Sequence, residues 1–111
     1  MKAIDRAKSH FENLSVKKIS VPEWAEDGKP FYLFASPLTL QETSKLYKMS
    51  KDDDMTMLVY ILIYKALDED GNKLFTLEDK STLLNKVDRN VIARVANEIM
   101  GNTPIEEVKK N

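Results

Sequence analysis

The stretch DDDMTMLVYILIYKAL, residues 52–67, decides the fold because it contains the longest apolar run of the chain. Three acids come first, and acids in that place stabilise the positive end of a helix. The apolar residues recur without a clear period, which does not separate a helix from a buried strand. The length of residues 54–67 and the acidic start favour a helix, apolar nearly all round and suited to the centre of a core.

The same stretch is too short to cross a membrane. A helix over residues 54–67 spans about 21 Å, whereas a bilayer requires about 30 Å. The N-terminus, MKAIDRAKSHFENL, is charged throughout and lacks the apolar centre of a signal peptide. With 111 residues, no cysteine and a net charge of −1, we expect a soluble intracellular protein. Disulfides, zinc–thiolate sites and a basic footprint for nucleic acid are not expected.

Two strands are predicted on the N-terminal side of the apolar stretch. Alternating apolar residues over 16–21 and 31–35 indicate a hairpin whose loop contains Asp27-Gly28. Because a lone hairpin is marginal in water, its apolar face must pack on helices. Trp24, at the end of the first strand, is expected to cover the junction between the hairpin and the helices.

Helices are predicted around these elements from apolar spacing and capping signals. A short amphipathic helix follows the three- and four-residue steps from Ile4 to Leu14. Three more helices are expected over residues 39–49, 76–86 and 88–100. Their capping signals are Thr39 with Glu42, Thr76 with Asp79, Asp88, and Gly101 as the final stop.

The predicted fold class is mainly α, with five to six short helices and one small β-hairpin near the N-terminus as a minor β part. Residues 1–101 are expected to form a single globular domain. Thr103-Pro104 followed by Glu106 indicates that residues 102–111 are a C-terminal tail or a short helix.

The stretch ALDEDGNKLFTLED, residues 66–79, resembles a calcium-binding loop but fails its spacing. A register that begins at Asp68 places Lys73 where the loop requires glycine, and a register that places Gly71 there begins at an alanine. We therefore interpret the stretch as a helix exit and a turn, after which Leu74-Phe75 return to the core. No metal site is expected.

An enzyme is not expected either, and a nucleic-acid site has little support. His10 is the only histidine and lies on a surface helix, and the chain has no glycine-rich phosphate loop and no nucleophile elbow. We therefore predict no catalytic residue and no cofactor. Residues 77–100 could be interpreted as a helix–turn–helix, but the second helix offers few base readers, among them Arg89 and Arg94, and Glu98 would repel phosphate.

Protein interaction is the remaining kind of site. Residues 54–67 are interpreted either as a central core helix or as a helix that meets another protein or another copy with part of its surface. Tyrosine and methionine are favoured at interfaces. The candidate protein-interaction residues are Trp24, Met57, Ile61 and Tyr64.

The order of several pieces resembles a known family. The pieces are ISVPEW (19–24), FYLFASPLTLQE (31–42), DDDMTMLVYILIYKAL (52–67), DEDGNKLFTLED (68–79) and NEIMGN (97–102). In this order and spacing they resemble the tail assembly chaperones of long-tailed bacteriophages, over about residues 16–102. No single piece is specific, so the order and the spacing carry the resemblance.

The resemblance implies a non-enzymatic assembly factor that works in the host bacterial cytoplasm and is absent from the mature virion. It implies the tape measure protein and the tail tube protein as partners, self-association into a homo-oligomer, and neither nucleic acid nor membrane. The family also makes a longer form by ribosomal frameshifting, and the two lysines of EEVKKN are compatible with slippery codons. The alternatives are a small helical DNA-binding regulator and a structural adaptor retained in the virion.

Overall fold

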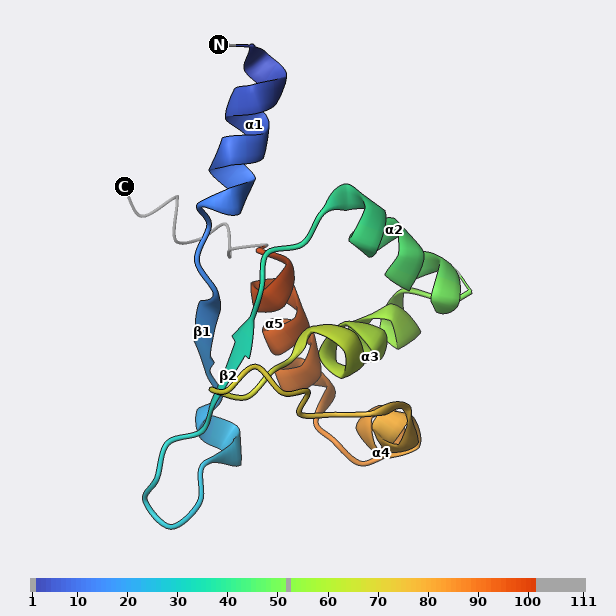
Figure 1. The fold of residues 1–111 in the computed structure, drawn as a ribbon. Coiled ribbons are helices and arrows are strands. Elements are labelled where there is room, and N and C mark those ends of the chain that lie inside the picture. Colours follow the sequence, from blue (N-terminus) through green and yellow to red (C-terminus); the bar gives the residue numbers. More distant parts are fainter. Residues whose placement is uncertain (1, 52, 102–111) are drawn as a thin grey trace, which may run out of the picture.

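The computed structural model describes residues 2–51 and 53–101 (Figure 1). The fold is mainly α with a minor β part, as predicted. In chain order the elements are α1 (Ala3–Glu12), β1 (Lys17–Ser20), the 3-10 turn η1 (Pro22–Trp24), β2 (Tyr32–Ala35), α2 (Leu40–Met49), α3 (Asp54–Lys65), the 3-10 turn η2 (Leu77–Asp79), α4 (Lys80–Asn85) and α5 (Arg89–Met100). The predicted tail or short helix over residues 102–111 lies outside the described residues.

Helix α3 is the centre of the core, so the helical interpretation of residues 54–67 is confirmed and the buried-strand alternative is wrong. It packs against α2, α4 and α5. Asp53 caps its start, where the carboxylate accepts the Met55 N–H at 3.1 Å and the Thr56 hydroxyl at 2.7 Å. Hydrogen bonds from Thr56 and Met55 lower the pKa of Asp53, which keeps the cap charged. The buried residues of α3 are Val59, Ile61, Leu62 and Ile63.

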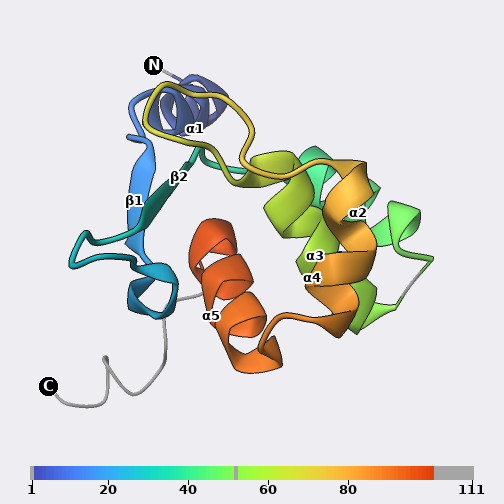
Figure 2. The ribbon, with the colours of Figure 1, turned by 90° about the horizontal axis from the view of Figure 1, so that it is seen from below.

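The hairpin covers α5 on the side away from α3 (Figures 1 and 2). Strands β1 and β2 are antiparallel, with Ile19 opposite Leu33. Alternation sends Ile19, Leu33 and Ala35 into the core, as the sequence predicts. The Lys17 Nζ donates to the carbonyl of Glu98 at 3.0 Å, so β1 begins beside the C-terminal end of α5.

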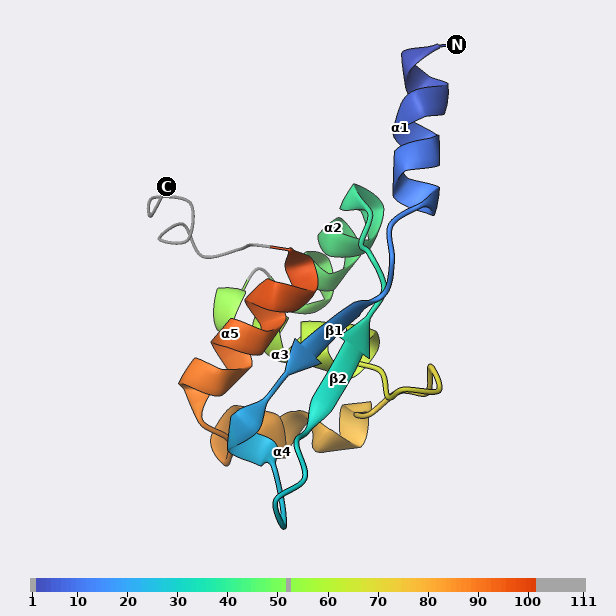
Figure 3. The ribbon, with the colours of Figure 1, turned by 90° about the vertical axis from the view of Figure 1, so that its left-hand side faces the viewer.

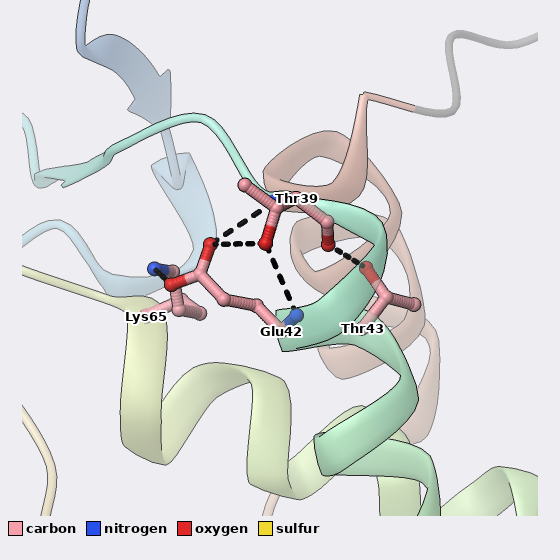
Figure 4. A network of polar contacts seen from close by, with 4 residues as sticks. All are labelled: Thr39, Glu42, Thr43 and Lys65. Atoms are coloured by element: carbon pink, nitrogen blue, oxygen red, sulfur yellow. Dashed lines mark hydrogen bonds and ion pairs between the residues drawn. The ribbon is translucent and has the colours of Figure 1, made fainter.

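A polar network joins the start of α2 to the end of α3 (Figure 4). The predicted capping box is present, since Thr39 Oγ1 accepts the Glu42 N–H at 3.1 Å and Glu42 Oε1 accepts the Thr39 N–H at 3.0 Å. Glu42 Oε2 also accepts Lys65 Nζ at 3.0 Å. The hydrogen bond from the Thr39 backbone, together with Lys65, lowers the pKa of Glu42 against the opposing effect of burial.

Loss of this network should weaken the fold in a pH-dependent way. Thr39→Ala is expected to lower the free energy of unfolding by about 1 kcal/mol, because it removes the cap.

Glu42→Gln should lower the free energy of unfolding by less than about 1 kcal/mol at neutral pH, since the Glu42 side chain is 44% exposed and its ion pair is screened. Because the folded-state pKa of Glu42 lies below the ordinary 4.5, its charge stabilises the fold above that value and ceases to do so as the pH falls through the lowered pKa.

The measurement is urea denaturation of the natural protein and of Glu42→Gln at neutral pH and again at about pH 3. The difference between the two proteins should shrink in acid. A difference that does not change would mean that the carboxylate acts only through its shape.

The segment between α3 and α4 is a turn, as predicted. Asp68 Oδ1 accepts the backbone N–H groups of Asp70 and Asn72 at 2.8 and 2.9 Å, and Gly71 has a φ of 90°. The Thr76–Asp79 capping box is present, but it caps the start of the 3-10 turn η2. The α-helix that follows is therefore shorter than predicted and covers only Lys80–Asn85. Leu74 and Phe75 return to pack on the core.

Helix α5 follows its sequence signals closely. The Asp88 side chain accepts the Asn90 N–H at 3.1 Å, and Gly101 ends the helix in the left-handed conformation with a φ of 86°. Its buried stripe is Val91, Ile92, Val95, Ala96 and Ile99. Within the described residues, no helix combines the length and the apolarity that a membrane crossing would require.

Helix α1 projects away from the other elements (Figures 1 and 3). It is the amphipathic helix that the sequence predicts, yet none of its residues is buried. Ile4 is 71% exposed, and Phe11 and Leu14 are exposed as well. The apolar stripe of this helix therefore finds no cover within the described chain.

Candidate protein-interaction surfaces

The four predicted interaction residues do not form one surface. Met57, Ile61 and Tyr64 lie on α3, and Trp24 lies in η1. Ile61 is 0% exposed and belongs to the core. A partner cannot reach its side chain in this structure, so Ile61 is better described by the core interpretation of α3. The other three residues are partly buried and pack on the edge of the core.

Met57 and Tyr64 share one side of α3 with Tyr60, and we call these three residues the tyrosine stripe. Their spacing of three and four residues places them on one helix face. The rings of Tyr60 and Tyr64 are 6.1 Å apart between centroids. Tyr60 was missed because a helix that is apolar nearly all round gives no sequence signal for its outer face.

Two lysines lie over the rings of the tyrosine stripe. Lys80 Nζ is 5.0 Å from the centroid of the Tyr60 ring and donates to its hydroxyl at 3.0 Å. Lys73 Nζ is 4.9 Å from the centroid of the Tyr64 ring. These cation–π contacts hold the rings in place and put positive charge beside them.

A hollow of about 310 Å³ lies between α2 and α3 at the end of the stripe. Tyr64, Leu46 and Met49 supply its apolar lining. Glu42, Lys45 and Lys65 also line it. Lys65 is ion-paired with Glu42, so the positive charge of the hollow comes from Lys45.

Trp24 forms a separate aromatic cluster beside the hairpin. Its ring meets Phe31 and Phe75 edge to face, with centroids 5.7 and 6.1 Å apart. The preceding residue, Glu23, accepts Arg94 Nη1 at 2.6 Å and Nη2 at 3.0 Å. The hydrogen bond from Arg94 lowers the pKa of Glu23. Arg94, a base reader in the helix–turn–helix interpretation, is thus engaged with a carboxylate of its own chain.

A third surface, which we call the apolar groove, lies between the start of α3, α4 and the start of α5. Its volume is about 420 Å³. Met55 at its edge is 65% exposed, and Leu84 is also exposed. The lining residues are Met55, Leu58, Val59, Leu83, Leu84, Val87, Arg89, Asn90, Ile92 and Ala93. The sequence did not reveal this groove because three separate segments build it.

Comparison with known proteins places the fold. No protein-family model matches the sequence, and no curated protein matches it either. Among solved structures, the tail assembly chaperone of bacteriophage HK97 is similar, with a TM-score of 0.58 over 87% of this chain and 93% of that chain. This chain has the fold of a phage tail assembly chaperone. The identity is 14%, so the likeness is one of fold.

The order of the sequence pieces indicates the tail assembly chaperone fold, so the resemblance is confirmed at the level of the fold. Within residues 2–51 and 53–101, no group of three or more His, Cys, Asp or Glu side chains is placed to hold a metal ion. The acids of the calcium-like stretch have another task, since Asp68 uses its carboxylate to close the turn. Among the described residues, the candidate contact surfaces include the tyrosine stripe, the Trp24 cluster, the apolar groove and the exposed stripe of α1.

Proposed function

We propose that the protein is a non-enzymatic tail assembly chaperone that binds the tape measure protein and helps to recruit tail tube subunits. The observation that supports this most strongly is the fold shared with the HK97 tail assembly chaperone over 87% of the chain. The protein would act in the host cytoplasm as a homo-oligomer and be left out of the mature virion. Residues 1–101 would be its folded domain, with 102–111 as a tail and a frameshifted longer form beside it.

The tyrosine stripe is the surface that we assign to the tape measure protein. Met57 is flexible and polarizable, and tyrosines give large contact area with little loss of conformational freedom. Lys73 and Lys80 at the stripe, with Lys45 at the hollow, favour a partner with acidic residues beside its apolar ones. An amphipathic helix of a long tape measure protein has this chemistry, and helix-in-groove binding suits such a partner.

Replacement of both rings should weaken this interaction. Tyr60→Ala with Tyr64→Ala is expected to reduce affinity for the tape measure protein at least tenfold, since buried tyrosines are frequent hot spots. Co-expression followed by pull-down and calorimetric titration measures the effect. Circular dichroism should show that the variant remains folded.

Tyr32→Ala is the matched control. Tyr32 is exposed on β2 and also carries a lysine over its ring, with Lys18 Nζ 4.2 Å from the centroid. Its loss should leave affinity unchanged. Equal binding by the double variant and the natural protein would exclude the stripe as the contact surface. Failure of the natural protein to bind the tape measure protein, or its presence in purified virions by mass spectrometry, would overturn the proposed function.

A further inference from the structure

Two apolar surfaces of this protein lack cover within the described residues. Helix α1 buries no residue and presents a stripe formed by Ile4, Ala7 and Phe11, which Leu14 continues just beyond the end of the helix. The apolar groove is a hollow between three helices with exposed residues at its edge. A convex helix with an apolar stripe and a groove with an apolar lining are the two halves of a helix-in-groove contact.

The dimensions and chemistry of the two halves agree. Ile4, Ala7, Phe11 and Leu14 follow the three- and four-residue steps by which a helix anchors in a groove. Ile4 and Phe11 are about 10 Å apart along the helix axis, and the groove of about 420 Å³ has room for their side chains. The helix carries two acids, Asp5 and Glu12, and two bases, Arg6 and Lys8. Arg89 is the cation in the lining of the groove, so the match between the two halves is one of apolar contact and not of net charge.

Helix α1 does not lie in the groove of its own chain. It projects from the hairpin, which packs on the side of α5 away from α3 (Figures 1 and 2). The apolar groove is lined by α5, α3 and α4. No residue of α1 is buried by the described part of its own chain.

The C-terminal residues of the chain are a weaker occupant of the groove. Residues 102–111 contain two large apolar side chains, Ile105 and Val108. Helix α1 and its link contribute Ile4, Phe11, Leu14 and Val16, all of them exposed. A second copy of the chain offers this larger apolar surface.

We propose that α1 of one copy docks in the apolar groove of a second copy. Each copy then uses its helix on one neighbour and its groove on another, a head-to-tail contact that produces closed rings or open chains. The proposal rests on the self-association that is part of the proposed function and assigns its surfaces. The contact is small beside a standard interface of about 800 Å² per partner. The association should therefore be weak and become visible only as the protein concentration rises.

Light scattering after size-exclusion chromatography of the full chain, over a concentration series, tests the proposal. The natural protein should shift from monomer to larger species, while Phe11→Asp on the helix and Met55→Asp on the groove should each associate at least tenfold more weakly. Ser9→Asp, on the polar side of α1, is the matched control and should assemble normally. Leu84→Glu replaces Met55→Asp if circular dichroism shows that the latter does not fold.

Mixing the two variants is the decisive measurement. Phe11→Asp keeps an intact groove and Met55→Asp keeps an intact helix, so an equimolar mixture should form a one-to-one complex and stop there. A mixture that stays monomeric, a natural protein that stays monomeric at the highest concentration, or single variants that assemble normally would each overturn the proposal.

Binding of the tape measure protein is measured separately through the tyrosine stripe. Loss of assembly with that binding intact rejects this inference alone, and loss of binding with assembly intact rejects only the proposed tape-measure function.

Discussion

Ile61→Asp is expected to unfold the protein. Ile61 is 0% exposed at the centre of α3 and belongs to the core that α3 shares with its neighbouring elements. An aspartate there would be a buried charge without a partner, which costs more than about 4 kcal/mol. Single domains have about 5–15 kcal/mol of stability in total. Circular dichroism and urea denaturation should show loss of the helical signal or a far lower midpoint.

Met55→Asp is the matched control because it introduces the same charge on the same helix. Met55 is 65% exposed, so the charge stays in water and the free energy of unfolding should change by less than about 0.5 kcal/mol. A folded Ile61→Asp protein that has lost only its partner would restore Ile61 to the interaction surface and contradict the packing of α3.

Leu33→Ala is expected to have the second largest effect. Leu33 is 0% exposed on β2, opposite Ile19, and joins the hairpin to the helical core. Removal of its branched side chain should lower the free energy of unfolding by about 3–5 kcal/mol, since it loses burial and leaves a cavity. Urea denaturation measures the loss, and the slope with denaturant should stay close to that of the natural protein.

The neighbouring residue provides the control for Leu33. Tyr32→Ala changes a side chain on the opposite face of the same strand, where Lys18 lies over its ring. It should cost about 1 kcal/mol or less. Equal losses from the two substitutions would mean that the strand does not present Leu33 to the core.

Local signals predicted the elements of the fold well, because they act within a few residues. The Thr39–Glu42 box and the Gly101 stop can both be identified from neighbouring sequence, and both are formed. The C-terminal end of α3 was predicted less well. The helix stops at Lys65 rather than at residue 67, because Leu67 pairs with the backbone of Phe34 through two hydrogen bonds of 2.8 Å. That contact joins distant parts of the chain, and no local pattern contains it.

The exposure of the candidate interaction residues was predicted only in part, for the same reason. Tyr64 and Met57 were identified by residue type, but the sequence of an all-apolar helix does not distinguish Ile61 inside from Tyr60 outside. The difference arises from what α2, α4 and α5 cover. The apolar groove was not predicted at all, because Met55, Leu84 and Ala93 come from three elements that meet only in the folded chain.

The exposure of α1 also affects how stable that helix is on its own. It has 10 residues, buries none of them, and begins at Lys2 without a side-chain cap. Isolated helices shorter than about 12–15 residues are marginal in water, so amide hydrogens in α1 should exchange with solvent far faster than those of α3 and α5. Docking on a second copy would then be a folding step as well as a binding step. Warming would consequently loosen the assembly well before the core of each subunit melts.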